Sequence, residues 1–363
     1  MQISSLDSKI VVAGSFEASL KKILAGRFTE TNSVFIIVDE NTKEHCLPLF
    51  KDLTFGLSNV ETKVIEIHSG EVNKSLATCE LVWNSLSQNK AGRNSLVVNL
   101  GGGMVCDLGG FAAATYKRGI DFINIPTTLL AQVDAAIGGK LAVNLNNVKN
   151  EIGIFRSPKY VIIDTIFLKT LDKENILSGF SEMIKHALIY SSSYWTNIQQ
   201  YNIEKRDLPK LEKLISKSIF IKSDFVKYDP KDKDMRRGLN FGNTIGFGFE
   251  DFMERKGETI SRGKAIAHGM ICELFLSHKK NFFPFDKLNL IARFVLATYG
   301  KLAITNKDFS DIISIIKEKR MTSIEGIPFT LLEDIGEVSI NEHCTEKLIH
   351  DALQFHEVFQ TDN

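Results

Sequence analysis

Short apolar runs alternate with longer amphipathic stretches over the first half of the chain, and this alternation predicts strands and helices in turn. Each apolar run is closed by glycine or polar residues, and the runs span residues 34–38, 63–67, 96–100, 122–125 and 160–163. A helix-like stretch, residues 73–89, lies between two of them. Strand patterns separated by helices are typical of an α/β domain with a largely parallel sheet.

After residue 168 the apolar residues recur at helical spacing instead, which predicts a mainly helical second domain. The periodic stretches span residues 174–190, 208–227, 240–254, 264–279, 286–302, 309–320 and 344–359. One segment, residues 328–340, has the pattern of a β-hairpin. We therefore expect an α/β domain over residues 1–168 and a helical domain over residues 169–363.

One stretch of the first domain has the order of elements that binds phosphate. The strand at residues 96–100 runs directly into Gly101, Gly102 and Gly103, and an alanine-rich helical stretch follows. Glycines let the backbone approach an anion, and the first N–H groups of the helix point at it. The turn alone is weak evidence, because the strict G-x-G-x-x-G pattern is not present.

Charged residues interrupt the apolar segment that contains and follows this turn. They are Asp107, Arg118, Asp134 and Lys140. A segment this apolar is expected to be mostly buried, and buried charges need partners. The charges therefore favour a binding site over a plain scaffold.

Composition narrows the classes of function. Lys plus Arg and Asp plus Glu both number 44, so the balance of charge argues against nucleic acid as a partner. No apolar run approaches the length of a membrane span, and the N-terminus does not have the pattern of a signal peptide. The five cysteines are scattered without C-x-x-C spacing, which is typical of reduced thiols in the cytoplasm.

Three segments together resemble one enzyme family. They are GGGMVCDLGGFAAATYKRG from Gly101, IPTTLLAQVDAAIGGK from Ile125 and VKNEIG from Val148. They are similar to the signature of 3-dehydroquinate synthase, a sugar phosphate cyclase of the shikimate pathway, and the resemblance runs from about residue 34 to about residue 320. It implies a Rossmann-like NAD domain, a helical domain, a zinc or cobalt ion, a homodimer, and cyclisation of a seven-carbon sugar acid phosphate with loss of phosphate.

The resemblance also implies roles for individual residues. Those matching contacts to NAD are Asp39, Asn41, Glu71, Lys74, Gly102, Gly103, Asp107, Thr127, Thr128, Lys140, Lys149, Phe167 and Thr170. Those matching the substrate and catalytic positions are Arg118, Asp134, Lys140, Asn150, Lys185, Lys222, Arg236 and Asn240. Glu182 matches a zinc ligand and shares one helix face with Lys185.

The chain departs from the family at the metal site. The family pattern G-H-T-x-G-H reads here as Gly242 to Phe247, so that Asn243 replaces a ligand and Phe247 replaces a catalytic histidine. The third ligand position holds Arg262. An amide is a poor zinc ligand and a guanidinium is not a ligand. We expect Arg262 to replace the metal by pairing with Glu182, and we expect His186 and His268 to be ordinary histidines and not substitute ligands.

Three functions remain open from the sequence. The chain is a working 3-dehydroquinate synthase, a divergent cyclase with a metal-free site and another reaction, or a non-catalytic protein that binds NAD and a sugar phosphate. The resemblance also leaves open whether Lys319 or Arg320 supplies a late basic contact.

Overall fold

The computed structural model describes residues 2–5, 8–12, 16–27, 31, 33–54, 61–146, 148–319 and 324–362. The chain forms two compact units. The first comprises Met1–Asp172 with Leu208–Lys227, and the second comprises Lys173–Asp207 with Tyr228–Asn363. The predicted domain boundary at residue 168 is close to Asp172, where the chain first leaves the first unit. It is wrong for residues 208–227, which return to the first unit although their pattern is helical.

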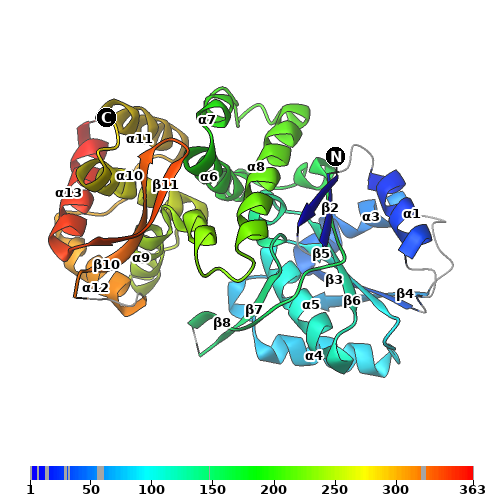
Figure 1. The fold of residues 1–363 in the computed structure, drawn as a ribbon. Helices are drawn as coiled ribbons and strands as arrows, with labels where there is room; N and C mark the ends of the chain where they lie inside the picture. Colours follow the sequence, from blue (N-terminus) through cyan, green and yellow to red (C-terminus); the bar gives the residue numbers. More distant parts are fainter. Residues whose placement is uncertain are drawn as a thin grey trace. The chain divides into compact units, whose positions relative to one another are not determined.

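A seven-stranded sheet forms the centre of the first unit (Figure 1), in the order β1-β2-β9-β6-β5-β3-β4. All neighbours pair in parallel except β1 and β2. The strands are β1 (Gln2–Ser5), β2 (Ser8–Val12), β3 (Ser33–Asp39), β4 (Glu61–Ile67), β5 (Leu96–Gly101), β6 (Asp121–Pro126) and β9 (Tyr160–Ile163). A separate hairpin pairs β7 (Lys140–Leu145) with β8 (Val148–Phe155).

Alternate residues of the strands serve two separate cores, one on each face of the sheet. Phe35 and Ile37 of β3 pack with α4 (Leu76–Gln88) and α5 (Gly103–Thr115). Ile36 and Val38 pack with α1 (Phe16–Arg27) and α3 (Leu47–Thr54) on the other face. Side chains alternate along a strand, so a continuous apolar run is what a sheet covered on both faces requires. The five predicted strands and the α/β class are confirmed.

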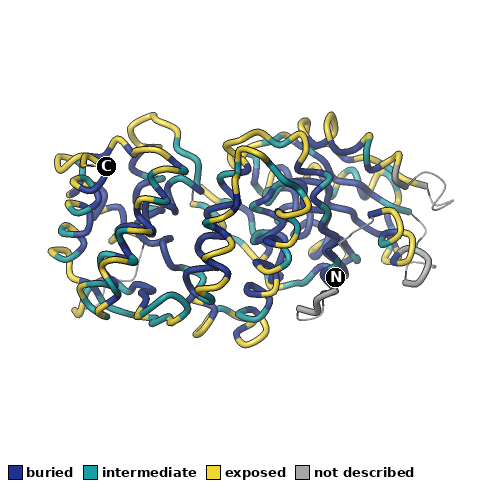
Figure 2. The backbone as a smooth tube through the Cα atoms, turned by 90° about the horizontal axis from the view of Figure 1, so that it is seen from above, coloured by how far each residue is buried: buried dark blue, intermediate teal, exposed yellow. Residues whose placement is uncertain are grey.

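The second unit is mainly helical, as predicted. Its helices are α6 (Lys173–Tyr190), α7 (Ser192–Gln199), α9 (Asn243–Arg255), α10 (Arg262–Asn281), α11 (Phe285–Tyr299), α12 (Phe309–Lys319) and α13 (Glu346–Asp362). The predicted hairpin is present as β10 (Ile327–Asp334) and β11 (Glu337–Cys344). Helix α10 is buried for most of its length, and buried residues fill the interior of the unit while its outer helices expose one side (Figure 2).

Helix α8 (Leu208–Tyr228) follows α7 of the second unit in the chain, but it packs as part of the first unit. Its apolar positions, among them Leu211, Ile215 and Ile219, are buried. In the described part of the chain, no helix is both long enough and apolar enough to cross a membrane.

Candidate functional site

The carboxyl ends of four parallel strands meet along one edge of the sheet in the first unit. Asp39 of β3 is in register with Ile67 of β4, and Gly101 of β5 is in register with Pro126 of β6. From β3 the chain continues to β4 on one side, and β5 then pairs with β3 on the other side. Ligands of open α/β sheets bind where the strand order reverses in this way. Asp39 and the glycine turn lie on the two sides of that point.

The glycine turn lets neighbouring residues approach the start of helix α5 closely. Gly102 is the residue before the helix and provides no side-chain cap. A Cβ at Gly102 would lie 3.1 Å from Thr128 Cγ2, and one at Gly103 would lie 3.1 Å from Ala135 Cβ. A side chain there would press on Thr128 or Ala135, whereas the bare backbone keeps the first N–H groups of the helix free of a side chain of their own, as phosphate binding requires. This fits the pyrophosphate of a dinucleotide.

Asp39 and the threonines after β6 follow the two strands that flank β5, whose end carries this turn. Asp39 Oδ1 caps α2 (Glu40–His45) by accepting hydrogen bonds from the Thr42 N–H at 2.7 Å and from Thr42 Oγ1 at 2.8 Å. Thr127 is buried and its N–H donates to the Gly101 carbonyl at 3.0 Å. The Thr128 hydroxyl accepts a hydrogen bond from the Ala131 N–H at 3.2 Å. The predicted cofactor residues of these loops therefore lie on the edge that carries the glycine turn.

A buried ammonium connects several predicted residues. Lys74 is 4% exposed, and its Nζ donates to Asp107 Oδ2 at 2.7 Å and to Asn150 Oδ1 at 2.6 Å. Burial raises the pKa of Asp107, and the charge of Lys74 opposes that rise. Asn150 takes a left-handed conformation with φ of 59°, and its N–H donates to Asn144 Oδ1 at 2.8 Å.

Asn144, which the sequence analysis missed, extends this network to the loop after β4. Its Nδ2 donates to the Glu71 carbonyl at 3.0 Å and to Glu71 Oε1 at 3.1 Å. An isolated bridge pairs Asn144 with Ser75. Asn144 therefore connects the β7–β8 hairpin to η1 (Glu71–Asn73). Only the tertiary contacts show that Asn144 belongs to this network.

Asp134 and Lys222 lie together although 88 positions separate them. Lys222 of α8 is 5% exposed, and its ammonium donates to the carboxylate and to the backbone carbonyl of Asp134. Asp134 belongs to η3 (Ala131–Ala135), a single π-helical turn. Such turns are common at functional sites. The pairing explains why α8 belongs to the first unit.

The remaining predicted residues of the first unit differ in exposure. Arg118, Lys140, Asn41 and Thr170 are exposed, and Lys149 is half-buried. Phe167 is buried at 2% exposure, and its ring meets Phe16 edge to face at 5.2 Å within the core. The Phe167 ring therefore stabilises the fold, and only its backbone remains for a cofactor.

In the second unit the predicted metal ligand Glu182 holds an ammonium. Lys185 Nζ lies 2.9 Å from Glu182 Oε2, and it donates to Glu182 Oε1 at 3.2 Å and to Asn243 Oδ1 at 2.6 Å. The side chains of Lys185 and Glu182 are 1% and 5% exposed. The predicted i, i+3 pair of Glu182 and Lys185 is thus present. It is buried, and Lys185 also donates to Asn243.

The expected pairing of Arg262 with Glu182 is wrong. The Arg262 guanidinium lies over the ring of Phe247, with Cζ 4.9 Å from the ring centroid. Among the described residues, the ion-pair partner of Glu182 is Lys185, which lies one helical turn away on α6. Glu182 thus pairs with a lysine of its own helix, and Arg262 of α10 stacks on Phe247 instead.

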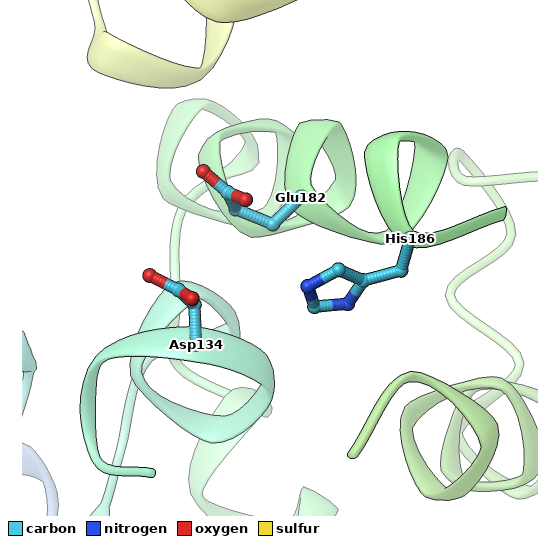
Figure 3. Close-up of side chains that lie close together, drawn as sticks. All are labelled: Asp134, Glu182 and His186. Carbon is cyan, nitrogen blue, oxygen red and sulfur yellow. The ribbon is translucent and has the colours of Figure 1, made fainter. Parts of the chain in front are cut away.

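The two histidines have different surroundings. His268 is buried, and its Nδ1 shares a 2.8 Å hydrogen bond with His356 Nε2. His186 is also buried, and one of its ring nitrogens lies within 4.8 Å of a Glu182 carboxylate oxygen. Figure 3 shows the Glu182 and His186 side chains leaving the same helix, α6.

Arg236 and Asn240 belong to η5 (Met235–Asn240), which a buried carboxylate holds in place. Asp229 accepts hydrogen bonds from the N–H groups of Lys233, Asp234 and Arg236. Burial raises the pKa of Asp229, but these N–H donors outweigh it and the pKa is lowered. Arg236 is 3% exposed and Asn240 is half-buried.

A second carboxylate that the sequence analysis missed anchors helix α9. Glu273 of α10 accepts hydrogen bonds from the Gly242 N–H at 2.6 Å and from the Ile245 N–H at 3.1 Å. Asn243 therefore lies at a helix end that Glu273 holds in place.

Of the two late basic residues, Lys319 pairs with Asp251 at 2.6 Å, and Arg320 lies outside the described residues.

Two of the three ligand positions that the resemblance implies hold groups that do not fit zinc, although Glu182 and the nearby His186 are of the ligand types that zinc accepts. A tetrahedral zinc site needs imidazole, thiolate or carboxylate ligands. Asn243 supplies an amide that already accepts from Lys185, and Arg262 supplies a cation. The glycine turn of the first unit does fit a dinucleotide.

Known proteins resemble this chain over nearly its whole length. The family model for the 3-dehydroquinate synthase N-terminal region matches residues 64–178, and the C-terminal model matches residues 179–321. The 3-dehydroquinate synthase of Parabacteroides distasonis is 40% identical over 96% of this chain and 98% of that protein. The enzyme of the same name from Thermoanaerobacter pseudethanolicus is 37% identical over 89% of this chain and 90% of that protein.

Solved structures support the fold. A 2-deoxy-scyllo-inosose synthase complexed with carbaglucose-6-phosphate, NAD+ and Co2+ matches with a TM-score of 0.82 at 22% identity, over 98% of this chain and 99% of that one. The 2-epi-5-epi-valiolone synthase from Streptomyces hygroscopicus, with NAD+ and Zn2+ bound, also gives 0.82, at 21% identity over 98% of both chains. Full-length similarity to curated relatives and both family models agree, and the chain belongs to the 3-dehydroquinate synthase family.

Proposed function

We propose that this chain catalyses an NAD-dependent cyclisation of a seven-carbon sugar acid phosphate, with loss of phosphate, as its family relatives' name implies. The observation that carries the proposal is the strand edge of the first unit. There the glycine turn, Asp39 and the buried Lys74 network follow the ends of neighbouring strands, which supports the NAD roles that the resemblance assigns to these residues.

NAD would accept a hydride from a substrate carbinol and return it later, so the overall reaction is redox-neutral. In this chain Gly102 and Gly103 would hold the pyrophosphate at the start of α5, and Asp39 would face the ribose hydroxyls. Lys74 would place one buried positive charge near the phosphates while it orients Asp107. These roles use only groups of the first unit.

Cationic residues would bind the anionic ends of the substrate. We assign the carboxylate to Arg236, Lys222 and Asn240, and the phosphate to Arg118, Lys140 and Asn150. A guanidinium can grip a carboxylate through two parallel hydrogen bonds. The Asp229 carboxylate supports this assignment because it fixes the backbone of the η5 turn from which Arg236 projects.

The altered metal site favours a second candidate function. Asn243, Phe247 and Arg262 replace three groups that the family pattern requires. A cyclase that has lost a Lewis acid could serve a different reaction on a related sugar phosphate, or could bind NAD and substrate without turnover. This candidate keeps the same fold and the same nucleotide edge.

Phosphate release separates the candidates. The protein is stripped with a chelator and incubated with NAD and the seven-carbon sugar acid phosphate precursor of 3-dehydroquinate, with and without added zinc or cobalt. Release of phosphate together with dehydroquinate supports the first proposal. NAD binding without any release of phosphate would refute it and favour the second.

We further propose a homodimer in a reducing, cytoplasmic setting. Its support is the resemblance and the five cysteines, all of which are free and buried. Burial raises the pKa of Cys46 to about 11, so this thiol stays protonated and unreactive. Sedimentation of the purified chain tests the dimer.

A further inference from the structure

We propose that a cavity at the starts of helices α6 and α10 binds a small zwitterion, namely an α-amino acid with a short apolar side chain. The cavity has a volume of about 280 Å³, and all of its lining residues belong to the second unit. They are Lys173, Glu174, Leu177, Ser261, Lys264 and Tyr299. None of them has a role in the proposed function, which this binding site therefore does not require. We call this cavity the zwitterion pocket.

The cation of the zwitterion pocket is Lys264 of α10. Lys264 is half-buried, and among the described residues its ammonium has no hydrogen-bond or ion-pair partner. Burial lowers the pKa of Lys264, and the charge of Glu174 opposes this change. The other lysine of the lining, Lys173, is exposed and already pairs with Glu204 at 2.5 Å. Lys264 is therefore the ammonium that gains most from an incoming carboxylate.

The anion of the zwitterion pocket is Glu174, which lies exposed in the first turn of α6. The dipole of a helix favours a carboxylate at this place. Lys264 and Glu174 interact through space, but no hydrogen bond or ion pair joins them or links Glu174 to another described residue. Two opposite charges thus line one cavity without meeting. A ligand that carries one charge of each sign can bridge them with a charge-assisted hydrogen bond at each end.

The remaining residues of the lining restrict the size and chemistry of the ligand. Leu177 and Tyr299 supply apolar surface, and the Tyr299 hydroxyl already donates to the Leu177 carbonyl at 3.0 Å. Ser261 Oγ accepts a hydrogen bond from the Lys264 N–H at 3.4 Å, and its own hydrogen can be donated to a carboxylate beside Lys264. The volume lies just below the roughly 300–1,000 Å³ of pockets for drug-sized ligands, which suits an amino acid.

The zwitterion pocket also adjoins the helices that carry Glu182 and Arg262. Burial raises the pKa of Tyr299, and the charge of Glu182 adds to this rise, so the phenol stays protonated as a donor to α6. A ligand that packs on Tyr299 and pairs with Lys264 would contact both α6 and α10. The pocket therefore offers a small metabolite a way to act on these two helices.

Calorimetric titration of the full chain with L-leucine and two truncated analogues tests the zwitterion pocket. The analogue 4-methylpentanoate lacks the ammonium group, and 3-methylbutylamine lacks the carboxylate, so each keeps one of the two charges. We expect L-leucine to bind with a Kd of about 1 mM or below, and each analogue to bind at least about tenfold more weakly.

Two variants locate the ligand. Lys264→Met and Glu174→Gln each remove one charge and should weaken L-leucine binding at least about tenfold. Lys264→Met should also bind L-leucine and 3-methylbutylamine equally, because the carboxylate has lost its partner. Lys279→Met is the matched control and should bind L-leucine as wild type does. It removes an exposed lysine near the other end of α10, where the ammonium lies 5.3 Å from the centre of the Phe275 ring.

Three results would overturn the proposal. The first is the absence of saturable L-leucine binding to wild type at about ten times the expected Kd, and this measurement decides even if a variant does not fold. The second is binding of 4-methylpentanoate as tight as that of L-leucine, which would make the cavity a simple anion site. The third is wild-type affinity in Lys264→Met, which would place the ligand elsewhere. These measurements need neither NAD nor turnover, so the cyclase can fail separately.

Discussion

Replacing Lys74 by Met tests whether charge pairing holds the nucleotide edge together. In the fold Lys74 Nζ lies 2.7 Å from Asp107 Oδ2, and the two side chains are 5% and 18% exposed. The substitution keeps most of the apolar stem and removes the ammonium. Asp107 then stays in place with a carboxylate whose burial already raises its pKa.

The magnitude follows from the geometry. Two unit charges separated by 2.7 Å attract by about 6 kcal/mol at an effective dielectric constant of about 20. Desolvation of both groups offsets much of this attraction. Removal of one partner of a well-buried pair costs about 3 to 5 kcal/mol, and the partial exposure of Asp107 places the expected loss of unfolding free energy near ~3 kcal/mol.

The loss should depend on pH in a defined direction. The pKa of Asp107 is raised in the fold, and without Lys74 it should rise further. The folded variant then binds a proton that the unfolded chain releases above about pH 4, so its stability falls as pH rises, by up to about 1.4 kcal/mol per pH unit. The deficit should be small near pH 4 and full at neutral pH.

The assay reads the first unit alone. The chain has two tryptophans, and Trp83 lies in the first unit with its Nε1 donating to the Ala112 carbonyl at 3.0 Å. In a Trp195→Phe background, urea unfolding followed by Trp83 fluorescence reports that unit. Lys159→Met is the control, because its pair with Asp121 is exposed and 3.6 Å long, and it should cost less than about 0.5 kcal/mol.

The double variant Lys74→Met/Asp107→Asn supplies the decisive comparison. It removes the uncompensated charge, so it should recover about 2 kcal/mol of the loss and abolish the pH dependence. If the double variant is as unstable as Lys74→Met at neutral pH, packing and not charge is the cause, and the reasoning is refuted.

Three further predictions concern other parts of the molecule. His356→Gln should reduce the acid instability of the second unit. Burial lowers the pKa of His356 to about 4, below its unfolded value of about 6.5, so its contribution to stability falls as pH drops through this window, by roughly 3 kcal/mol. Burial also lowers the pKa of its partner His268, so part of the acid instability should remain. Gly263→Ala should cost about 1–3 kcal/mol, because its Cβ would lie 2.3 Å from Ser178 Cα. Gly102→Ala should weaken NAD binding by at least about tenfold, since its Cβ would crowd Thr128 at the start of α5, where the phosphate is proposed to bind.

Each of these has a matched measurement. Urea unfolding read by Trp195 fluorescence follows the second unit, with the exposed His350→Gln as control, and an unchanged pH slope in His356→Gln would contradict the first. Gly92→Ala has nothing within 4 Å of its Cβ and should change stability by less than about 0.5 kcal/mol. Calorimetric titration measures the NAD affinity of Gly102→Ala. Wild-type affinity in this variant would show that the NAD phosphates do not bind at this turn.

Local patterns carried the prediction of the sheet because its strands are buried on both faces. Uninterrupted apolar runs such as residues 96–100 mark such strands without any knowledge of their neighbours. Apolar runs were not informative where a strand mixes polar and apolar residues. β7 and β8 each hold one asparagine and have many exposed or half-buried positions, so their pairing depends on each other rather than on burial. The hairpin was therefore missed, and with it Asn144.

The position of α8 shows a different limit. Its periodicity predicted a helix with near-identical bounds, yet it gave no sign of the unit to which the helix belongs. The contact of Lys222 with Asp134 joins α8 to the first unit. These two residues are too far apart in the sequence for any local spacing pattern to relate them. A helix can bury the same apolar face against either unit, and only the three-dimensional packing selects one.

Residue type and local period were sufficient to predict the family, the order of strands and helices, and the presence of Asn243 and Arg262 at two ligand positions. They also predicted that Glu182 and Lys185 share one helix face. The burial of this pair, its contact with Asn243 and the stacking of Arg262 on Phe247 could be seen only in three dimensions. The physical reason is that a buried cation takes whichever acceptors the packed helices bring within about 3 Å, and that distance is set by backbone approach and not by sequence spacing.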